Sequence, residues 1–170
     1  MIILGLDPGL ATTGYGIIEK KGSKLTLITY GIIATKSSEA FPDRLLSISN
    51  QLTTLLNKYT ISEVAIEDLF FNNNTKTAIS VAQARGVLIL AVKKENMFIE
   101  SYTPPEIKLG ISGYGKATKS QVQYMVKQLL NLTETPKPDD AADALAIAIC
   151  HANNYRIKQT KRNILNKLDR

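Results

Sequence analysis

The sequence contains very few of the residues that form disulfides, zinc sites or membrane spans. It has one cysteine, one histidine and no tryptophan among 170 residues. The single Cys150 excludes an internal disulfide, and one cysteine with one histidine leaves no conventional zinc cluster. No apolar run approaches the roughly 20 residues that cross a bilayer, and the start of the chain lacks the features of a signal peptide. These absences predict a cytoplasmic protein in which Cys150 packs as a small hydrophobic residue; a reactive thiol is the weaker alternative.

What is present is an ordinary globular composition with an uneven distribution of charge. Hydrophobic residues make up 44% and charged residues 21% of the chain, and the length favours one domain. The formal net charge is +6, and residues 156–170 hold six Lys or Arg against one Asp, which gives this segment +5. We therefore predict a domain over residues 1–155 and a basic C-terminal tail over 156–170. Such a tail suits a polyanionic partner, although charge that only aids solubility also explains the composition.

Hydrophobic periodicity predicts an α/β fold with a mixed five-stranded sheet and helices on both faces. The first third alternates β-forming residues around turn signals, and the later strands are separated by segments with helical spacing. Crossovers of this kind place parallel strands beside antiparallel ones. The predicted strands are 1–6, 14–18, 24–35, 62–69 and 97–101, and the predicted helices are 41–59, 77–94, a short one from 104, 119–130 and 139–153, the last able to continue into the tail.

The predicted helix over 77–94 has apolar residues on more than one face. A helix of this kind must be buried on two sides. One side can pack on the sheet, and the other needs a neighbouring helix or a second subunit. Val87 and Leu90 are the interface candidates.

Acidic residues occur where the predicted elements can bring them together. One ends the first strand, one lies on the fourth strand, and three begin the last helix: Asp7, Glu67, Asp139, Asp140 and Asp143. Turn initiation explains Asp7 taken alone, and helix capping explains one or two of the helical acids. Asp143 lies among alanines on a buried helix, and like charges this close need a cation or a shifted pKa. Spacing does not choose between Asp139 and Asp140 as its partner.

Oxygen ligands in this number predict a magnesium site. Hard carboxylate ligands suit Mg²⁺, or Mn²⁺ in its place, rather than zinc. Two such ions, bridged by carboxylates, would polarise a phosphodiester and generate the attacking hydroxide. The expected chemistry is therefore two-metal hydrolysis of a phosphodiester.

Four sequence strings, in order along nearly the whole chain, resemble the RuvC family of crossover junction endodeoxyribonucleases. They are LGLDPGLATTGYGII, QARG, GISGYGKATKSQVQYMV and DDAADALAIAICHA. The resemblance implies an RNase H-like fold, a homodimer that makes paired nicks across a Holliday junction in recombination and repair, and coupling to a RuvA and RuvB branch-migration complex.

The family motifs also imply roles for individual residues. Asp7, Glu67, Asp140 and Asp143 match the acidic catalytic and metal-binding set, which selects Asp140 over Asp139 by analogy alone. Phe70 matches an aromatic residue that stacks on or wedges open bases near the crossover; a buried core residue is the alternative. Basic DNA contacts are implied at Lys108, Lys116 and Lys119, for which solvated surface lysines are the alternative.

Two other functions fit parts of the sequence. An ATP-binding domain of the actin and sugar kinase type also begins with a strand, an acid and a Gly-rich turn, but such proteins duplicate the domain and 170 residues are too few for two. A non-catalytic DNA-binding module gains nothing from concentrating acids where phosphate must lie. His151, about two helical turns beyond Asp143, is interpreted as structural.

Overall fold

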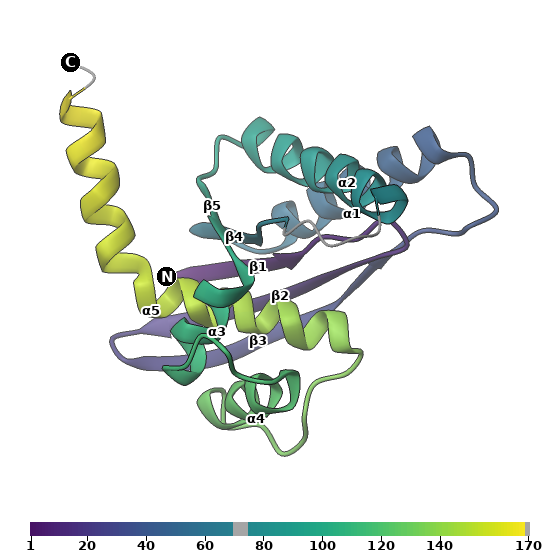
Figure 1. Ribbon diagram of the computed structural model, residues 1–170. Coiled ribbons are helices and arrows are strands. Elements are labelled where there is room, and N and C mark those ends of the chain that lie inside the picture. Colours follow the sequence, from purple (N-terminus) through teal and green to yellow (C-terminus); the bar gives the residue numbers. More distant parts are fainter. Residues whose placement is uncertain (70–74, 169–170) are drawn as a thin grey trace.

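The computed structural model describes residues 1–69 and 75–168, and in that part of the chain the strands form one mixed sheet (Figure 1). The strand order is β3-β2-β1-β4-β5. β1 pairs antiparallel with β2 and parallel with β4, so it lies where the two halves of the sheet meet. The predicted α/β class with a mixed sheet is confirmed. The strands are β1 (Ile2–Asp7), β2 (Thr12–Lys21), β3 (Lys24–Ala34), β4 (Glu63–Glu67) and β5 (Ile99–Tyr102).

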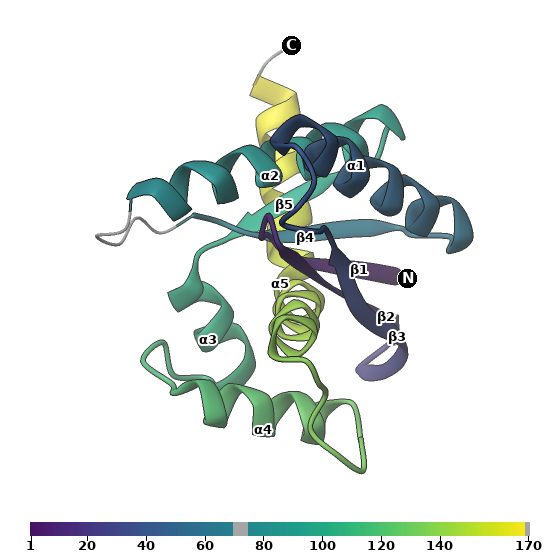
Figure 2. The same ribbon diagram turned by 90° about the vertical axis from the view of Figure 1, so that its right-hand side faces the viewer.

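Helices cover both faces of this sheet, as Figures 1 and 2 show. One face carries α1 (Phe41–Lys58) and α2 (Thr75–Lys94). The other face carries α5 (Asp139–Leu168), with α3 (Pro104–Ser112) and α4 (Lys119–Leu129) packed around it. None of the helices in the described part of the chain has the length and apolar character that crossing a membrane requires.

The alternation of side chains along β1 divides the core between these two layers. Leu4 and Leu6 are fully buried on the side of α1 and α2, whereas Ile3 is fully buried on the side of α5. Successive residues of a strand point to opposite faces, and here both faces are covered, so the whole strand is apolar.

Two glycines let the start of α5 lie in main-chain contact with the sheet. A Cβ atom on Gly5 would lie 2.1 Å from the carbonyl oxygen of Ala144, and one on Gly14 would lie 1.9 Å from the carbonyl oxygen of Asp140. Both distances are too short for any side chain. Because Gly14 pairs with Asp7 across the β1 and β2 strands, this contact brings the first turn of α5 over the end of β1.

Helix α5 continues through the segment predicted as a tail, as far as Leu168. Arg162 pairs with Glu63 at 3.1 Å and with Glu100 at 3.5 Å, and Lys158 pairs with Glu100 at 2.8 Å. These ion pairs join the second half of the helix to the edge of the sheet. The sequence left this continuation open because few apolar residues mark it.

His151 is fully buried, in agreement with the expected structural role. Its Nδ1 atom lies 2.9 Å from the hydroxyl of Tyr102, and its Nε2 atom lies 3.5 Å from a carboxylate oxygen of Glu63. It therefore joins α5 to β4 and β5.

Helix α2 buries one side and exposes the other. Ala84, Leu88 and Val92 are fully buried, whereas Ile79 is 62% and Leu90 is 56% exposed. Within one chain α2 is therefore not covered on both sides, and an apolar face is left toward solvent.

Candidate active site

The carboxylates of the candidate site are carried to one end of the sheet by three elements. Asp7 is the last residue of β1 and Glu67 is the last residue of β4. These strands are parallel neighbours, so their carboxyl ends lie at the same end of the sheet. Asp140 and Asp143 lie in the first turns of α5, which the glycine contacts hold over β1.

The pKa of Asp7 is raised by burial and by the neighbouring acids. Burial raises this pKa to about 8. The negative charges of Glu67, Asp143 and Asp140 add to the rise because they disfavour another charge nearby, and the Lys119 ammonium opposes it.

Glu67 and Asp143 are perturbed in the same direction. Burial raises the pKa of Glu67 to about 7, and the charge of Asp143 adds to the rise. Burial also raises the pKa of Asp143, although its hydrogen bond from Lys119 opposes the change. A buried group of carboxylates that repel one another is stabilised by protons or by a cation.

Lys119 provides a positive charge beside these acids. Its Nζ atom lies 2.9 Å from Asp143 and 3.1 Å from Asp139, and the two pairs raise the pKa of the lysine. Asp139 also accepts a hydrogen bond of 3.2 Å from Gln123, and its side chain is 65% exposed. Asp139 therefore points to the outside of the cluster, whereas Asp140 is among the charges that act on Asp7.

A cavity of about 190 Å³ opens beside the acids. Its lining includes Glu67 and Asp143 together with Lys108 and Lys119, so two of the predicted DNA contacts share a surface with two of the acids. Lys116 is exposed in the loop before α4 and does not line this cavity. Phe70 lies outside the described residues.

The donor set fits a hard divalent cation, but the side chains do not enclose one as they stand. Among the residues that the structure describes, no three His, Cys, Asp or Glu side chains are grouped closely enough to hold a metal ion. The carboxylate oxygens are ligands that Mg²⁺ prefers, and their mutual repulsion is what a bound cation relieves.

Arg85 is a contributor to the site that the sequence reading missed. It donates from Nε to the carbonyl oxygen of Glu67 at 2.9 Å and from Nη2 to the hydroxyl of Ser101 at 2.7 Å, and it pairs with Asp68 at 3.0 Å. It therefore holds the end of β4 in place. The sequence feature that could have identified Arg85 is its position as the one charged residue in the middle of α2, within the QARG string.

Comparison with known proteins matches nearly the whole chain. The model of the family described as crossover junction endodeoxyribonuclease RuvC matches residues 3–151. A protein of that name from Halothermothrix orenii is 55% identical over 159 residues, which cover 94% of this chain and 96% of the relative.

Solved structures agree with the family match. The RuvC structure of Thermus thermophilus has 32% sequence identity and a TM-score of 0.85, covering 93% of this chain and 97% of that one. A second T. thermophilus RuvC structure, in complex with a Holliday junction substrate, has 29% identity and a TM-score of 0.84, covering 92% and 96%.

Proposed function

Because the chain belongs to the RuvC family of crossover junction endodeoxyribonucleases, we propose that it resolves Holliday junctions by symmetric paired nicks. The observation that carries the proposal is the meeting of Asp7, Glu67 and the acids of α5 at one edge of an RNase H-like sheet. The similar T. thermophilus protein is described in complex with a Holliday junction substrate. The activity would serve recombination and repair.

We assign the metal site to Asp7, Glu67, Asp140 and Asp143. These residues would hold Mg²⁺ or Mn²⁺, with two ions per site. The bound ions supply Lewis-acid activation of the phosphodiester and of the attacking water. The expected products are a 5′-phosphate and a 3′-hydroxyl.

The lysines of the cavity have a separate task. Lys119 holds Asp143 and presents a positive charge beside the position where negative charge develops on the phosphate. Lys108 lines the same cavity, and its charge opposes the rise in the pKa of Glu67, so it favours the ionised carboxylate. Together with Lys116 and Phe70, these lysines are our proposed DNA contacts.

The proposed active form is a homodimer built on α2. Ile79 and Leu90 give this helix an exposed apolar face, and a Cβ atom on Gly86 would meet no other atom within 4 Å. A two-fold dimer offers one active site to each of two opposed strands of a junction. Coupling to RuvA and RuvB, a cytoplasmic location and the division at residue 155 stay predictions.

Cleavage of a synthetic four-way junction tests the function. In Mg²⁺ the wild type should release paired nicked products without hydrolysing ATP, whereas Asp7→Asn should bind the junction and leave it uncut. Asp139→Asn is the matched control, because Asp139 lies on the outer side of the cluster and should be dispensable for cleavage. ATP turnover, or an Asp7→Asn variant that cuts at the wild-type rate, would contradict the proposal.

A further inference from the structure

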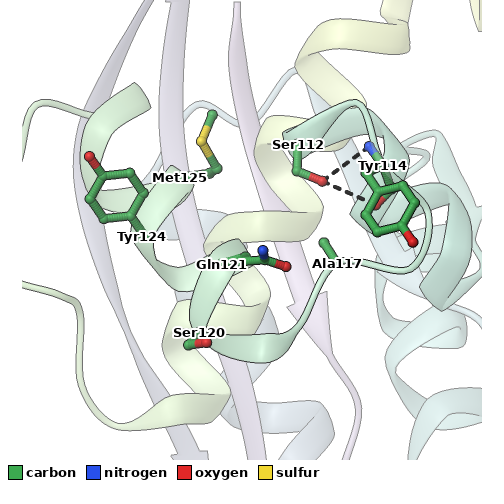
Figure 3. Close-up of a pocket in the computed structure, with 7 residues that line it drawn as sticks. All are labelled: Ser112, Tyr114, Ala117, Ser120, Gln121, Tyr124 and Met125. Carbon is green, nitrogen blue, oxygen red and sulfur yellow. Dashed lines mark hydrogen bonds between the residues drawn. The ribbon is translucent and has the colours of Figure 1, made fainter.

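A second hollow, of about 350 Å³, lies between the end of α3 and α4. We call it the tyrosine pocket. Figure 3 shows its lining, in which the two tyrosines flank a mixture of polar and apolar side chains. The residues used below are Tyr114, Ala117, Ser120, Gln121, Tyr124 and Met125. None of them belongs to the acidic cluster, and the volume is within the range of ligand sites.

The walls of the tyrosine pocket expose both aromatic surface and hydrogen-bonding groups. Tyr114 is 58% and Tyr124 is 60% exposed. The buried Ala117 and the partly buried Met125 form an apolar part of the lining. Within the described part of the chain, neither tyrosine hydroxyl has a hydrogen-bond partner, and the Nε2 amide of Gln121 has none either. Ring faces and donors are therefore available to a ligand.

Local hydrogen bonds hold these walls in position. The N–H of Tyr114 donates to the hydroxyl of Ser112 at 3.2 Å, and that hydroxyl lies 2.8 Å from the carbonyl oxygen of Lys108, to which it donates. Gly113 ends α3 with a φ of 72°, which a side chain disfavours. On the other wall, the N–H of Thr118 donates to Oε1 of Gln121 at 2.8 Å. The pocket is thus formed before any ligand arrives.

The first turn of α4 connects the tyrosine pocket to the candidate active site. Lys119 pairs with Asp143 on one side of this turn, and Ser120 and Gln121 line the pocket on another. The loop from Gly113 to Lys119 carries Lys116 and Lys119 and no acid. A phosphodiester strand lying against the acids is therefore attracted toward this loop.

We infer that the tyrosine pocket receives one unstacked nucleobase of the DNA strand that passes the active site; this inference rests on the proposed function. Every base has a π face that can stack on Tyr114 or Tyr124, and base recognition outside a duplex commonly uses such stacking. The free amide hydrogens of Gln121 can donate to an acceptor on the edge of the base. Lysines on the adjoining loop favour a polyanionic ligand over a neutral one.

Abasic scanning of a four-way junction tests the inference. Affinity is measured without divalent metal, for junctions that each lack one base near the nick. Wild type should lose about tenfold in affinity at one position, because stacking of one base contributes roughly 1–3 kcal/mol. The Tyr114→Ala, Tyr124→Ala double variant should bind the intact junction about tenfold more weakly and should be insensitive to that same missing base.

Two controls separate stacking from a general loss of binding. The double Tyr→Phe variant keeps both rings and should behave as wild type. Phe98→Ala removes a ring that is 56% exposed just before the start of β5, whereas the acids meet at the other end of the sheet, and it should also behave as wild type.

The outcomes distinguish the two proposals. A wild type that does not cut junctions in Mg²⁺ overturns the proposed function. A wild type that cuts, but whose affinity depends on no single base, overturns the tyrosine pocket alone. The tyrosine pocket is also overturned if the missing base weakens binding by the double variant as much as it weakens binding by wild type, so that the two losses in affinity multiply.

Discussion

Arg85 donates its Nε hydrogen to the main-chain oxygen of Glu67 over 2.9 Å, so a helix that follows β4 in the chain holds the end of that strand. The same guanidinium reaches Ser101 on the next strand, β5. A side chain that spans two strand ends fixes their relative position.

Replacing Arg85 should therefore lower cleavage without abolishing junction binding. Arg85→Met should reduce the rate about tenfold or more, since a hydrogen bond from a charged group contributes roughly 1.5–3 kcal/mol. Added Mg²⁺ should restore part of the rate if the loss comes from a displaced Glu67. Single-turnover cleavage over a Mg²⁺ series measures both effects. Arg44→Met, which removes a bond of 2.9 Å to Thr35 away from the site, is the control; equal rates for the two variants would contradict the assignment.

The raised pKa of Asp7 predicts how the metal-free protein responds to pH. Its ordinary value is 3.8, and its folded value is about 8, so between these limits the folded state binds the extra proton. The contribution of Asp7 to stability is then greatest at low pH and is lost as the pH rises from about 4 through 8. Asp7→Asn should remove this loss and stabilise the metal-free protein at pH 9 by on the order of 2 kcal/mol. Thermal unfolding from pH 5 to pH 9 in a chelator is the measurement, and parallel curves for the two proteins would count against it.

The exposed apolar face of α2 predicts a dimer that a single charged substitution in this face would dissociate. Leu90→Lys should give a monomer in sedimentation that makes single rather than paired nicks. Ile157→Lys places the same charge on α5, at a residue that is 71% exposed, and should leave the dimer intact. Sedimentation of Leu90→Lys as a dimer would refute the assignment of the interface.

Neighbouring basic residues of α5 should have different tasks. Lys161 is exposed. If this segment contacts phosphate, Lys161→Gln should reduce the slope of log affinity against log salt concentration by about one. Arg162 is engaged by Glu63 and Glu100, so Arg162→Gln should instead lower stability, by about 1–3 kcal/mol. Salt titrations and urea unfolding of both variants separate the two effects. An unchanged slope for Lys161→Gln would remove the basis for a DNA role of this segment.

Much of the fold followed from patterns that are local in the chain. The alternation around β1 and the spacing along α1 express burial directly, and apart from the C-terminal end of α5 the predicted elements lie within a few residues of their observed limits. The second half of α5 was harder, because its ion pairs join Arg162 to residues such as Glu63 that lie far away in the sequence. Pairings of that kind leave no periodic signal.

The candidate site, too, could be predicted from the sequence only in part. Asp143 attracted attention because a buried helix seldom carries an acid. In the structure it is partly buried near other acids, and it pairs with Lys119 at 2.9 Å. The preference for Asp140 over Asp139 came only from the family motifs, and it stays a prediction. Asp139 pairs with Lys119 and is 65% exposed, whereas Asp140 is among the charges that act on Asp7. Arg85 was overlooked because its partner is a main-chain oxygen, which no sequence pattern marks.

The seam between α5 and the sheet has a consequence for how the enzyme can evolve. At Gly5 and Gly14 the two elements touch through their backbones, without adaptable side chains between them. In an ordinary core, neighbouring side chains can change rotamer to accommodate a mutation. At these two glycines the contact is between main chains, so no side chain can adjust. A single added methyl group would shift the acids of the helix relative to that of the strand. Sequence drift is therefore tolerated around this seam far more readily than within it.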